Sequence, residues 1–313
     1  MSLNRLAALG LLAACQTECP PEPFRAPSSE PWMAVRVGIS HTCGLTVGSP
    51  YPVGQSEFSA GEVRCWGAAP TGDAALPLLD NAPRGRHWSL AIEHTGDTEV
   101  PELACAYGGG GGTCWGRETL APVPVLSVGP AGGEACAGDG WLHCYDLSTL
   151  QTPTWVDLAR PILNFDFGPG LLATIDYEAG TLGVQLHEWD EPPTAVPDGT
   201  WTRVAQGGKS GALCAIRDSG SLHCWRAVEG PDLAIADTPD GEYDDVCIFT
   251  GLDAACALDT DGRATCWGDD APESPTRRYA ALSCGHTSVC GQLEDGRLQC
   301  WGACEHGECD VPE

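Results

Sequence analysis

Pairs of cysteines are the residues whose spacing most clearly predicts chemistry in this chain of 313 residues, which contains 18 cysteines. Three segments place two cysteines ten residues apart, with an Asp-Gly or Ser-Gly turn midway between them. Such a turn predicts a β-hairpin, and residues directly opposite on its strands have Cα atoms close enough for a disulfide. We therefore predict one disulfide across each hairpin. The pairs are Cys214 with Cys224, Cys256 with Cys266, and Cys290 with Cys300.

Weaker copies of this hairpin occur throughout the chain. They pair Cys43 with Cys65 across a long insertion, Cys105 with Cys114, and Cys136 with Cys144. A fourth unit has Ala173 and Glu188 where the others have cysteines, so both members are replaced together. Two cysteines that form a disulfide are expected to be replaced together. The alternative, two reduced and buried cysteines, would allow either one to be replaced alone. Disulfides in turn indicate an oxidising compartment.

The remaining cysteines are less determined. The segment from Cys304 to Cys309 contains His306 and two glutamates, which is a metal-ligand composition, but in an oxidising compartment a small disulfide loop is favoured. Cys247 and Cys284 lie on the entry strands of adjacent units. They pair with each other or with Cys19, and the spacing does not decide between these alternatives.

The N-terminal residues predict export. A short basic segment precedes an apolar run from Leu6 to Ala14, which is typical of a secretory signal. Leu12-Ala13-Ala14-Cys15 resembles the lipobox of bacterial lipoproteins, so residues 1–15 are predicted to be the signal and Cys15 the lipid-attachment residue. Gln16 favours the outer membrane by the same resemblance. The alternative is an ordinary signal peptide cut near Ala14, with Cys15 in a disulfide.

The elements that carry the cysteines form a repeat. Short β-rich runs alternate with Gly and Pro, and no helical periodicity persists, so an all-β fold is predicted. The residues that close each unit recur with a mean period of about 39 residues, which is typical of propellers and solenoids. An entry glycine recurs as Gly38, Gly168, Gly251 and Gly285. The closing residues are Trp66, Trp115, Tyr145, Trp189, Trp225, Trp267 and Trp301.

These units resemble the repeats of the regulator of chromosome condensation family. The matching stretches are HTCGL at 41–45, CALDTDGRATCWG at 256–268 and VCGQLEDGRLQCWG at 289–302. Their short period is similar to that of the propeller-type β-lactamase inhibitor protein of the same superfamily. The resemblance implies a seven-bladed β-propeller with disulfide-stapled hairpins over residues 32–313, and residues 16–31, rich in proline, are predicted to be a tether.

Motifs for catalysis and cofactor binding are not found in the sequence. Gly-X-Ser-X-Gly and His-Glu-X-X-His do not occur, and the phosphate-loop-like segment 207–210 has Arg203 where that motif requires glycine. Asp259-Thr260-Asp261-Gly262 is a hairpin turn rather than a calcium loop. His143, His187 and His223 lie one residue before the exit cysteine or its replacement. On the face opposite the disulfide they are predicted to pack or to lie exposed, rather than to bind a metal. No catalytic residue, cofactor or metal is therefore predicted.

The charge of the chain bears on its partners. A formal net charge of −27 disfavours nucleic acid and anionic lipid surfaces, so contact with the membrane is expected only through the anchor. Tyr51 and Trp141 break the aromatic period and are candidates for protein contact. The sequence predicts a monomeric, non-enzymatic, lipid-anchored protein-binding propeller of the bacterial outer membrane or cell surface. The alternatives are a propeller lyase or hydrolase with a site at the axial mouth, and an inhibitor of a secreted hydrolase.

The first prediction concerns the lipobox. Replacing Cys15 by serine (Cys15→Ser) removes the thiol that would receive the lipid. We expect the variant to leave the membrane fraction or to accumulate as an uncleaved precursor, as measured by fractionation and immunoblotting. A mature variant that remained membrane-bound would contradict the assignment.

Overall fold

The computed structural model describes residues 24–48, 50–53, 56–67, 82–92, 103–108, 111–116, 129–131, 134–138, 142–146, 161–168, 171–186, 193–207 and 211–313. Within these ranges the regular elements are β-strands together with one 3₁₀ turn, η2 (Ala234–Ala236). The prediction of an all-β fold is confirmed.

The described strands form seven three-stranded antiparallel sheets, numbered here in chain order, and one two-stranded ribbon. Sheet 1 contains β1 (Trp32–Val37), β2 (His41–Thr46) and β5 (Val63–Gly67); sheet 2 contains β6 (His87–Ile92), β7 (Leu103–Gly108) and β8 (Gly111–Gly116); sheet 3 contains β9 (Gly129–Ala131), β10 (Glu134–Gly138) and β11 (Leu142–Asp146). Sheet 4 contains β12 (Ile162–Gly168), β13 (Leu171–Asp176) and β14 (Leu182–Leu186); sheet 5 contains β15 (Trp201–Gly207), β16 (Ala212–Arg217) and β17 (Leu222–Arg226). Sheet 6 contains β18 (Tyr243–Ile248), β19 (Ala254–Asp259) and β20 (Ala264–Gly268); sheet 7 contains β21 (Tyr279–Cys284), β22 (Ser288–Leu293) and β23 (Leu298–Gly302). The ribbon is β3 (Pro50–Val53) with β4 (Ser56–Ser59).

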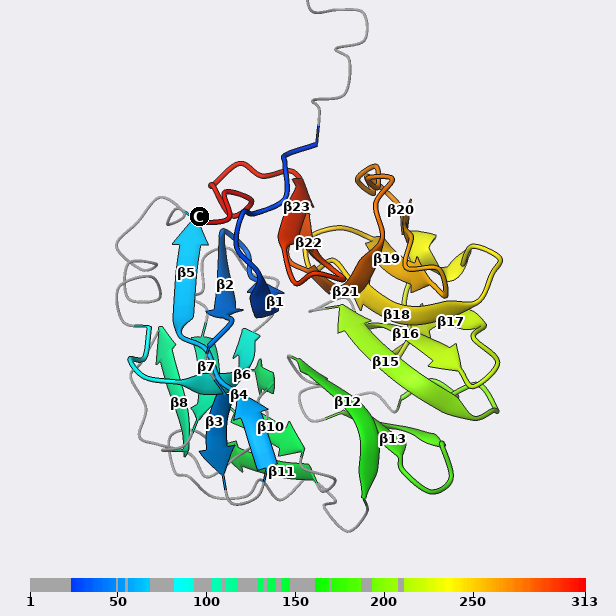
Figure 1. Ribbon diagram of the computed structural model, residues 1–313. Coiled ribbons are helices and arrows are strands. Elements are labelled where there is room, and N and C mark those ends of the chain that lie inside the picture. Colours follow the sequence, from blue (N-terminus) through cyan, green and yellow to red (C-terminus); the bar gives the residue numbers. More distant parts are fainter. Residues whose placement is uncertain are drawn as a thin grey trace, which may run out of the picture.

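The sheets follow one another around a common centre (Figure 1). The first strand of each sheet contacts the first strand of the next, in the order β1, β6, β9, β12, β15, β18 and β21. Strand β21 in turn contacts β1, so the series closes on itself. Closure places the first strands innermost and leaves the last strand of each sheet at the periphery.

Local sequence explains the outer two strands of sheets 5, 6 and 7. Gly220, Gly262 and Gly296 have φ angles of +81°, +78° and +83°, a region that glycine adopts without steric cost. Each of these residues turns the chain between the second and third strands. The following strands pair so that Cys214 lies opposite Cys224, Cys256 opposite Cys266, and Cys290 opposite Cys300.

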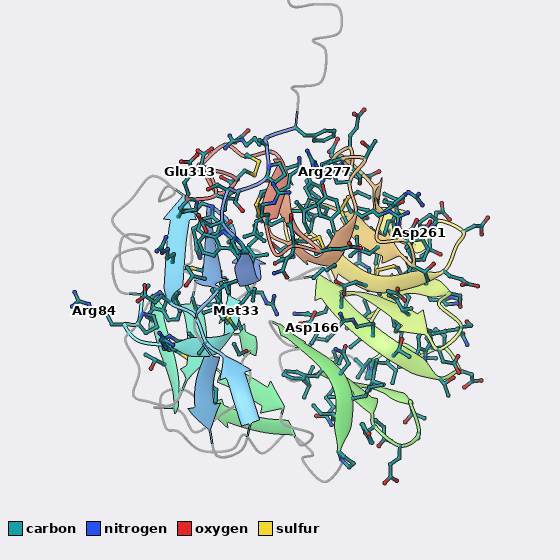
Figure 2. The ribbon with its side chains drawn as sticks, in the orientation of Figure 1. Met33, Arg84, Asp166, Asp261, Arg277 and Glu313 are labelled. Carbon is teal, nitrogen blue, oxygen red and sulfur yellow. A yellow bond between two sulfur atoms is a disulfide. The ribbon has the colours of Figure 1, made fainter. Side chains whose placement is uncertain are left out.

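One type of interface recurs between neighbouring sheets. The face of sheet 7 that carries Cys290 and Cys300 packs against Trp32 and Trp66 of sheet 1. In the same way, Cys256 of sheet 6 packs with Trp301 of sheet 7. The cysteine face of sheet 1 meets Trp115 of sheet 2, and that of sheet 5 meets Trp267 of sheet 6. Disulfides, drawn as yellow bonds in Figure 2, therefore form part of the core between sheets.

Sheet 4 corrects one part of the sequence alignment. Ala173 lies opposite Val184 rather than Glu188, and the place of the closing tryptophan, predicted for Trp189, is taken by Gln185. The turn fixes this register: Gly180 N donates to Asp176 O at 3.0 Å, and Asp176 Oδ1 accepts from the next backbone N–H groups. The sequence alignment followed tryptophan rather than turn length, so it placed the partner of Ala173 four residues too late, at Glu188 instead of Val184. Glu188 and Trp189 lie outside the described residues.

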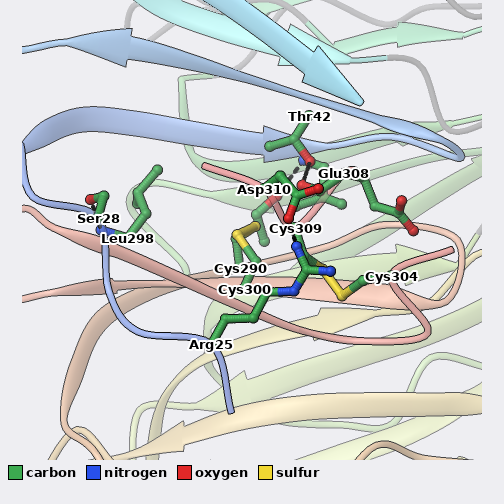
Figure 3. Close-up of a disulfide and its surroundings, with 12 residues drawn as sticks. Arg25, Ser28, Thr42, Cys290, Leu298, Cys300, Cys304, Glu308, Cys309 and Asp310 are labelled. Atoms are coloured by element: carbon green, nitrogen blue, oxygen red, sulfur yellow. Dashed lines mark hydrogen bonds and ion pairs between the residues drawn. A yellow bond between two sulfur atoms is a disulfide. The ribbon is translucent and has the colours of Figure 1, made fainter. Parts of the chain in front are cut away.

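The boundary predicted between tether and domain also requires correction. Ser28 N donates to Leu298 O at 2.8 Å, and Leu298 N donates to Ser28 Oγ at 2.9 Å. Gln299 Nε2 donates to Arg25 O at 2.7 Å, and Arg25 forms an ion pair with Asp310 (Figure 3). Residues 25–31 therefore belong to the folded domain. They supply hydrogen-bond partners to polar groups of β23, and the sequence pattern gives no sign of this contact.

The corrected register of sheet 4 gives a second prediction. The double substitution Ala173→Cys with Val184→Cys is expected to form a disulfide and raise the midpoint of thermal unfolding. Closing a loop of about ten residues stabilises by at most about 3 kcal/mol in the chain-entropy model. The matched control, Ala173→Cys with Glu188→Cys, should keep two free thiols in a labelling assay. A disulfide in the control alone would show that the register is wrong.

Candidate functional site

Charged side chains from four sheets converge near the centre of the ring. They are Arg36 on β1, Asp166 on β12, Arg203 on β15 and Asp245 on β18, called here the axial cluster. Arg203 Nη2 lies 3.1 Å from Asp245 Oδ1. Asp245 and Asp166 both act electrostatically on Arg36. Figure 2 shows Asp166 in the middle of the ring.

The axial carboxylates hold neighbouring inner strands together. Asp166 Oδ2 accepts from Gln206 N at 2.9 Å, and Asp245 Oδ2 accepts from Leu282 N at 3.2 Å. Two uncharged side chains act in the same way: Asn164 Oδ1 accepts from Val204 N at 3.0 Å, and Ser283 Oγ accepts from Val37 N at 3.1 Å. These bonds satisfy inner-strand N–H groups that have no further strand beside them. Asp166 and Asp245 thus hold neighbouring inner strands together through hydrogen bonds to their backbone.

The charge of the axial cluster is balanced. Desolvation lowers the pKa of Arg36, while Asp245 and Asp166 oppose that shift. Arg36 keeps solvent-accessible surface, yet the surrounding sheets remove enough water to produce the effect. An arginine remains protonated in proteins, so two guanidinium groups face two carboxylates.

Three loops form a connected surface where the first and second strands of sheets 6, 7 and 1 join. Thr250 N donates to Gly285 O at 3.0 Å, and His286 N donates to Gly38 O at 3.2 Å. A Cβ on Gly285 would lie 2.4 Å from Gly38 O, and one on Gly251 would lie 2.4 Å from the His286 ring. Close approach of the loops therefore explains the entry glycines at positions 251 and 285. We call the end of the ring that carries these loops the loop face.

An open cavity of about 590 Å³ lies on the loop face beside the ends of β20 and β23. This volume is within the range of small-molecule sites, roughly 300–1,000 Å³. Phe24, Leu252, Pro272 and Trp301 supply apolar surface. Asp270, Glu273 and Glu305 line the same cavity, together with Arg25.

The structure joins most of the cysteines that the sequence predicts as pairs. Cα atoms are 4.0 Å apart in the hairpin disulfides Cys43–Cys65, Cys105–Cys114, Cys214–Cys224, Cys256–Cys266 and Cys290–Cys300. Cys136 lies opposite Cys144 in the register of sheet 3, and their side chains lie outside the described part of the structure. Cys304 and Cys309 form a disulfide with a Cα separation of 5.5 Å.

The structure resolves one pairing that the sequence left open. Cys247 on β18 and Cys284 on β21 form a disulfide with Cα atoms 5.5 Å apart, which links sheet 6 covalently to sheet 7. Their placement on adjacent inner strands was the available signal, but only the packing of the two sheets shows that their facing sides meet. Cys19 lies outside the described residues.

Other predicted positions contribute less to a site. Tyr51 belongs to β3, and its side chain lies outside the described residues, as do Trp141 and Cys15. His223 lies across from Ala215 and packs edge-on against Trp201 with ring centroids 5.8 Å apart. Among the described residues no cluster of three or more His, Cys, Asp or Glu side chains has metal-binding geometry. In the same ranges no helix is long and apolar enough to cross a membrane.

Comparison with solved structures identifies the fold as a β-propeller. The CRINKLY WD40 ectodomain of the Arabidopsis thaliana receptor kinase ACR4 has a TM-score of 0.61 and 18% identity, covering 88% of this chain and 97% of that one. The ectodomain of the Physcomitrella patens receptor kinase CR4 has a TM-score of 0.59 and 19% identity, and the match covers 86% of this chain and 72% of that one. The β-propeller domain of Myceliophteria thermophila Cps50 (Swd1) has a TM-score of 0.55 and 14% identity, and the match covers 90% of this chain and 99% of that one. No protein-family model and no curated protein sequence matches the chain.

The axial cluster gives a third prediction. Asp245→Ala removes the acceptor of Leu282 N and the partner of Arg203. We expect a loss of about 1–3 kcal/mol in the free energy of unfolding, because the partly buried N–H of Leu282 loses its acceptor, whereas the exposed Arg203 contributes little. The neighbouring exposed Asp244→Ala is the control, with an expected change within about 0.5 kcal/mol. Equal effects in denaturant titrations would show that Asp245 does not link the inner strands.

Proposed function

We propose that this protein is a lipid-anchored, non-enzymatic protein-binding propeller of seven blades at the bacterial outer membrane or cell surface, related to the regulator of chromosome condensation repeats. Seven three-stranded sheets with contacting first strands support the blade number. The lipobox-like segment ending at Cys15 supports the anchor. Disulfides on five hairpins support an oxidising location.

The observation that carries the proposal is the open cavity on the loop face. Its apolar surface and several carboxylates lie beside the ends of two sheets, where a partner has access. Loops held on a rigid scaffold are common binding surfaces. The net charge of −27 favours a partner with a basic surface and opposes nucleic acid or anionic lipid.

The axial cluster favours one second candidate, a propeller hydrolase or lyase. Arginines and carboxylates from four sheets converge there, as an active site at the axis would require. Their bonds to inner-strand N–H groups favour a structural role instead. A chromogenic hydrolase and lyase screen in which activity is lost on Arg36→Ala, in a variant of unchanged stability, would favour the enzyme.

Site-specific photo-cross-linking in the envelope tests the binding proposal. A photoreactive residue at the exposed position Glu305 on the loop face should form a discrete adduct with another protein. The matched control is Glu294, which is also exposed but lies at the opposite end of sheet 7. Adducts at the control position alone, or at neither position, would contradict a partner on the loop face.

A further inference from the structure

Three cysteines lie side by side across sheet 6. Cys247 on β18 is opposite Cys256 on β19, and Cys256 is opposite Cys266 on β20. Residues directly opposite on antiparallel strands point to the same face of the sheet, so the three side chains form one row, called here the cysteine row. Cys256 forms its disulfide with Cys266, and Cys247 forms its disulfide with Cys284 of sheet 7.

The described strands of the other six sheets contain no such row. In each of them the inner-strand residue opposite the entry cysteine, or opposite Ala173 in sheet 4, is not a cysteine. These residues are Arg36, Ala91, Gly129, Asp166, Ala205 and Ser283. Only in sheet 6, among the described strands, does a second disulfide therefore lie in register with the hairpin disulfide.

The cysteine row faces a matching row of sheet 7. Cys284 is opposite Val289, which is opposite Trp301. Both rows belong to one hydrophobic cluster between the two sheets. The sulfur atoms of two disulfides therefore share this cluster, with Cys284 at its inner end and Cys266 at its outer end.

The outer end of the cysteine row reaches the surface. Cys256 is fully buried, whereas Cys266, on the last strand of the sheet, is partly exposed. The partly exposed Ser274 donates its hydroxyl hydrogen to Cys266 Sγ at 3.2 Å, so this sulfur contacts a polar group outside the cluster. Cys247 is also partly exposed but lies on an innermost strand. A thiol that approaches from the periphery therefore meets Cys266 first.

We propose that Cys266 is a site of modification by small thiols and that the cysteine row passes the exchange inward to Cys284. The thiolate of an external thiol attacks Cys266 Sγ, which forms a mixed disulfide and releases Cys256 as a thiolate. Cys256 then attacks Cys247, which forms a new Cys247–Cys256 disulfide and releases Cys284. The Cys284 thiolate takes the proton that the external thiol lost. Two disulfides break and two form, so no oxidant or reductant is consumed.

Register and burial favour the second step. Cα atoms of directly opposite residues are about 4.5–5.5 Å apart, and a disulfide spans about 4.4–6.8 Å between Cα atoms. Because Cys256 is fully buried, an external thiol does not reach it. The reaction partners available to its thiolate are the sulfur atoms beside it, those of Cys266 and Cys247. This exchange goes beyond the proposed binding function and does not depend on it.

The exchange removes the covalent link between the inner strands of sheets 6 and 7. Cys284 directly precedes Gly285, whose carbonyl accepts from Thr250 N at 3.0 Å on the loop face. The open cavity takes its walls from the same two sheets, since Leu252 and Trp301 both line it. Modification at the outer strand therefore loosens a joint at the centre of the ring and the cavity that spans it.

Hydrogen exchange measures this loosening. In the thiol-modified protein we expect the amides of Thr250 and Gly251, which bond to the loop of sheet 7, to exchange severalfold faster. The amide of Trp32 is the control, because its bond to Gly296 O joins sheet 7 to the other neighbour, sheet 1. Unchanged exchange at Thr250 and Gly251, or an equal increase at Trp32, would contradict a released link between sheets 6 and 7.

Disulfide mapping tests the route. After free thiols are blocked with iodoacetamide, the protein is treated briefly with limiting cysteamine, a cationic thiol that the net charge of −27 attracts. New thiols are then trapped with N-ethylmaleimide before mass spectrometry. We expect cysteamine on Cys266, a Cys247–Cys256 disulfide and N-ethylmaleimide on Cys284. Cysteamine on Cys247 or Cys284, a trapped Cys256, or no reaction in the cysteine row would overturn the proposal.

Two double variants separate transfer along the row from direct opening of the inner disulfide. Cys256→Ser with Cys266→Ser removes the entry point and should slow cysteamine-dependent labelling of Cys284 by about tenfold or more. The matched control, Cys43→Ser with Cys65→Ser, removes a hairpin disulfide that is also partly exposed but has no cysteine opposite it, and should leave this labelling within about twofold. Equal labelling of Cys284 in the two variants would reject the transfer. Mapping of the unmodified sequence requires neither variant to fold.

Discussion

The structure depends on one repeated contact, in which the disulfide face of a sheet packs against the tryptophan face of the next. In the described interfaces a flat indole covers a sulfur bridge and the small residues around it, as Trp66 does with Cys290 and Cys300. Neither face forms a core within its own sheet, because a three-stranded sheet has too little area to bury both of its sides. Stability of each sheet is therefore shared with two neighbours, as in other repeat proteins.

A second set of contacts, hydrogen bonds from backbone to side chain, joins the innermost strands of neighbouring sheets. Asp166, Asp245 and Ser283 each accept a hydrogen from the backbone of the following inner strand. The innermost strands lack a hydrogen-bonding neighbour on one side, so polar side chains take that role. Polar residues near the axis of a ring are thus required by the backbone before any function is considered, and charge convergence there is weak evidence for catalysis.

Local patterns predicted the fold well. Turn glycines and cysteine spacing determined the hairpins, since both depend on residues close in sequence, such as Gly262 between Cys256 and Cys266. The pattern failed where it relied on a single tryptophan: Trp189 was aligned in sheet 4, although the Asp176 turn places Gln185 there. The contact of Ser28 with Leu298, the Cys247–Cys284 bridge and the cavity beside Trp301 join distant segments, and their geometry depends on how the sheets pack. None has a local signature.

The C-terminal disulfide loop has a consequence for biosynthesis. Glu308 O receives hydrogen bonds from Thr42 Oγ1, 266 residues earlier, and from Trp66 Nε1, 242 residues earlier. The Cys304–Cys309 bridge holds that carbonyl in place (Figure 3). Because synthesis proceeds from the N-terminus, the tryptophan side of sheet 1 stays uncovered until residues 290–309 have been made. Chaperones would meet that side of sheet 1 for most of synthesis, and chains truncated before residue 290 would present it permanently to proteases.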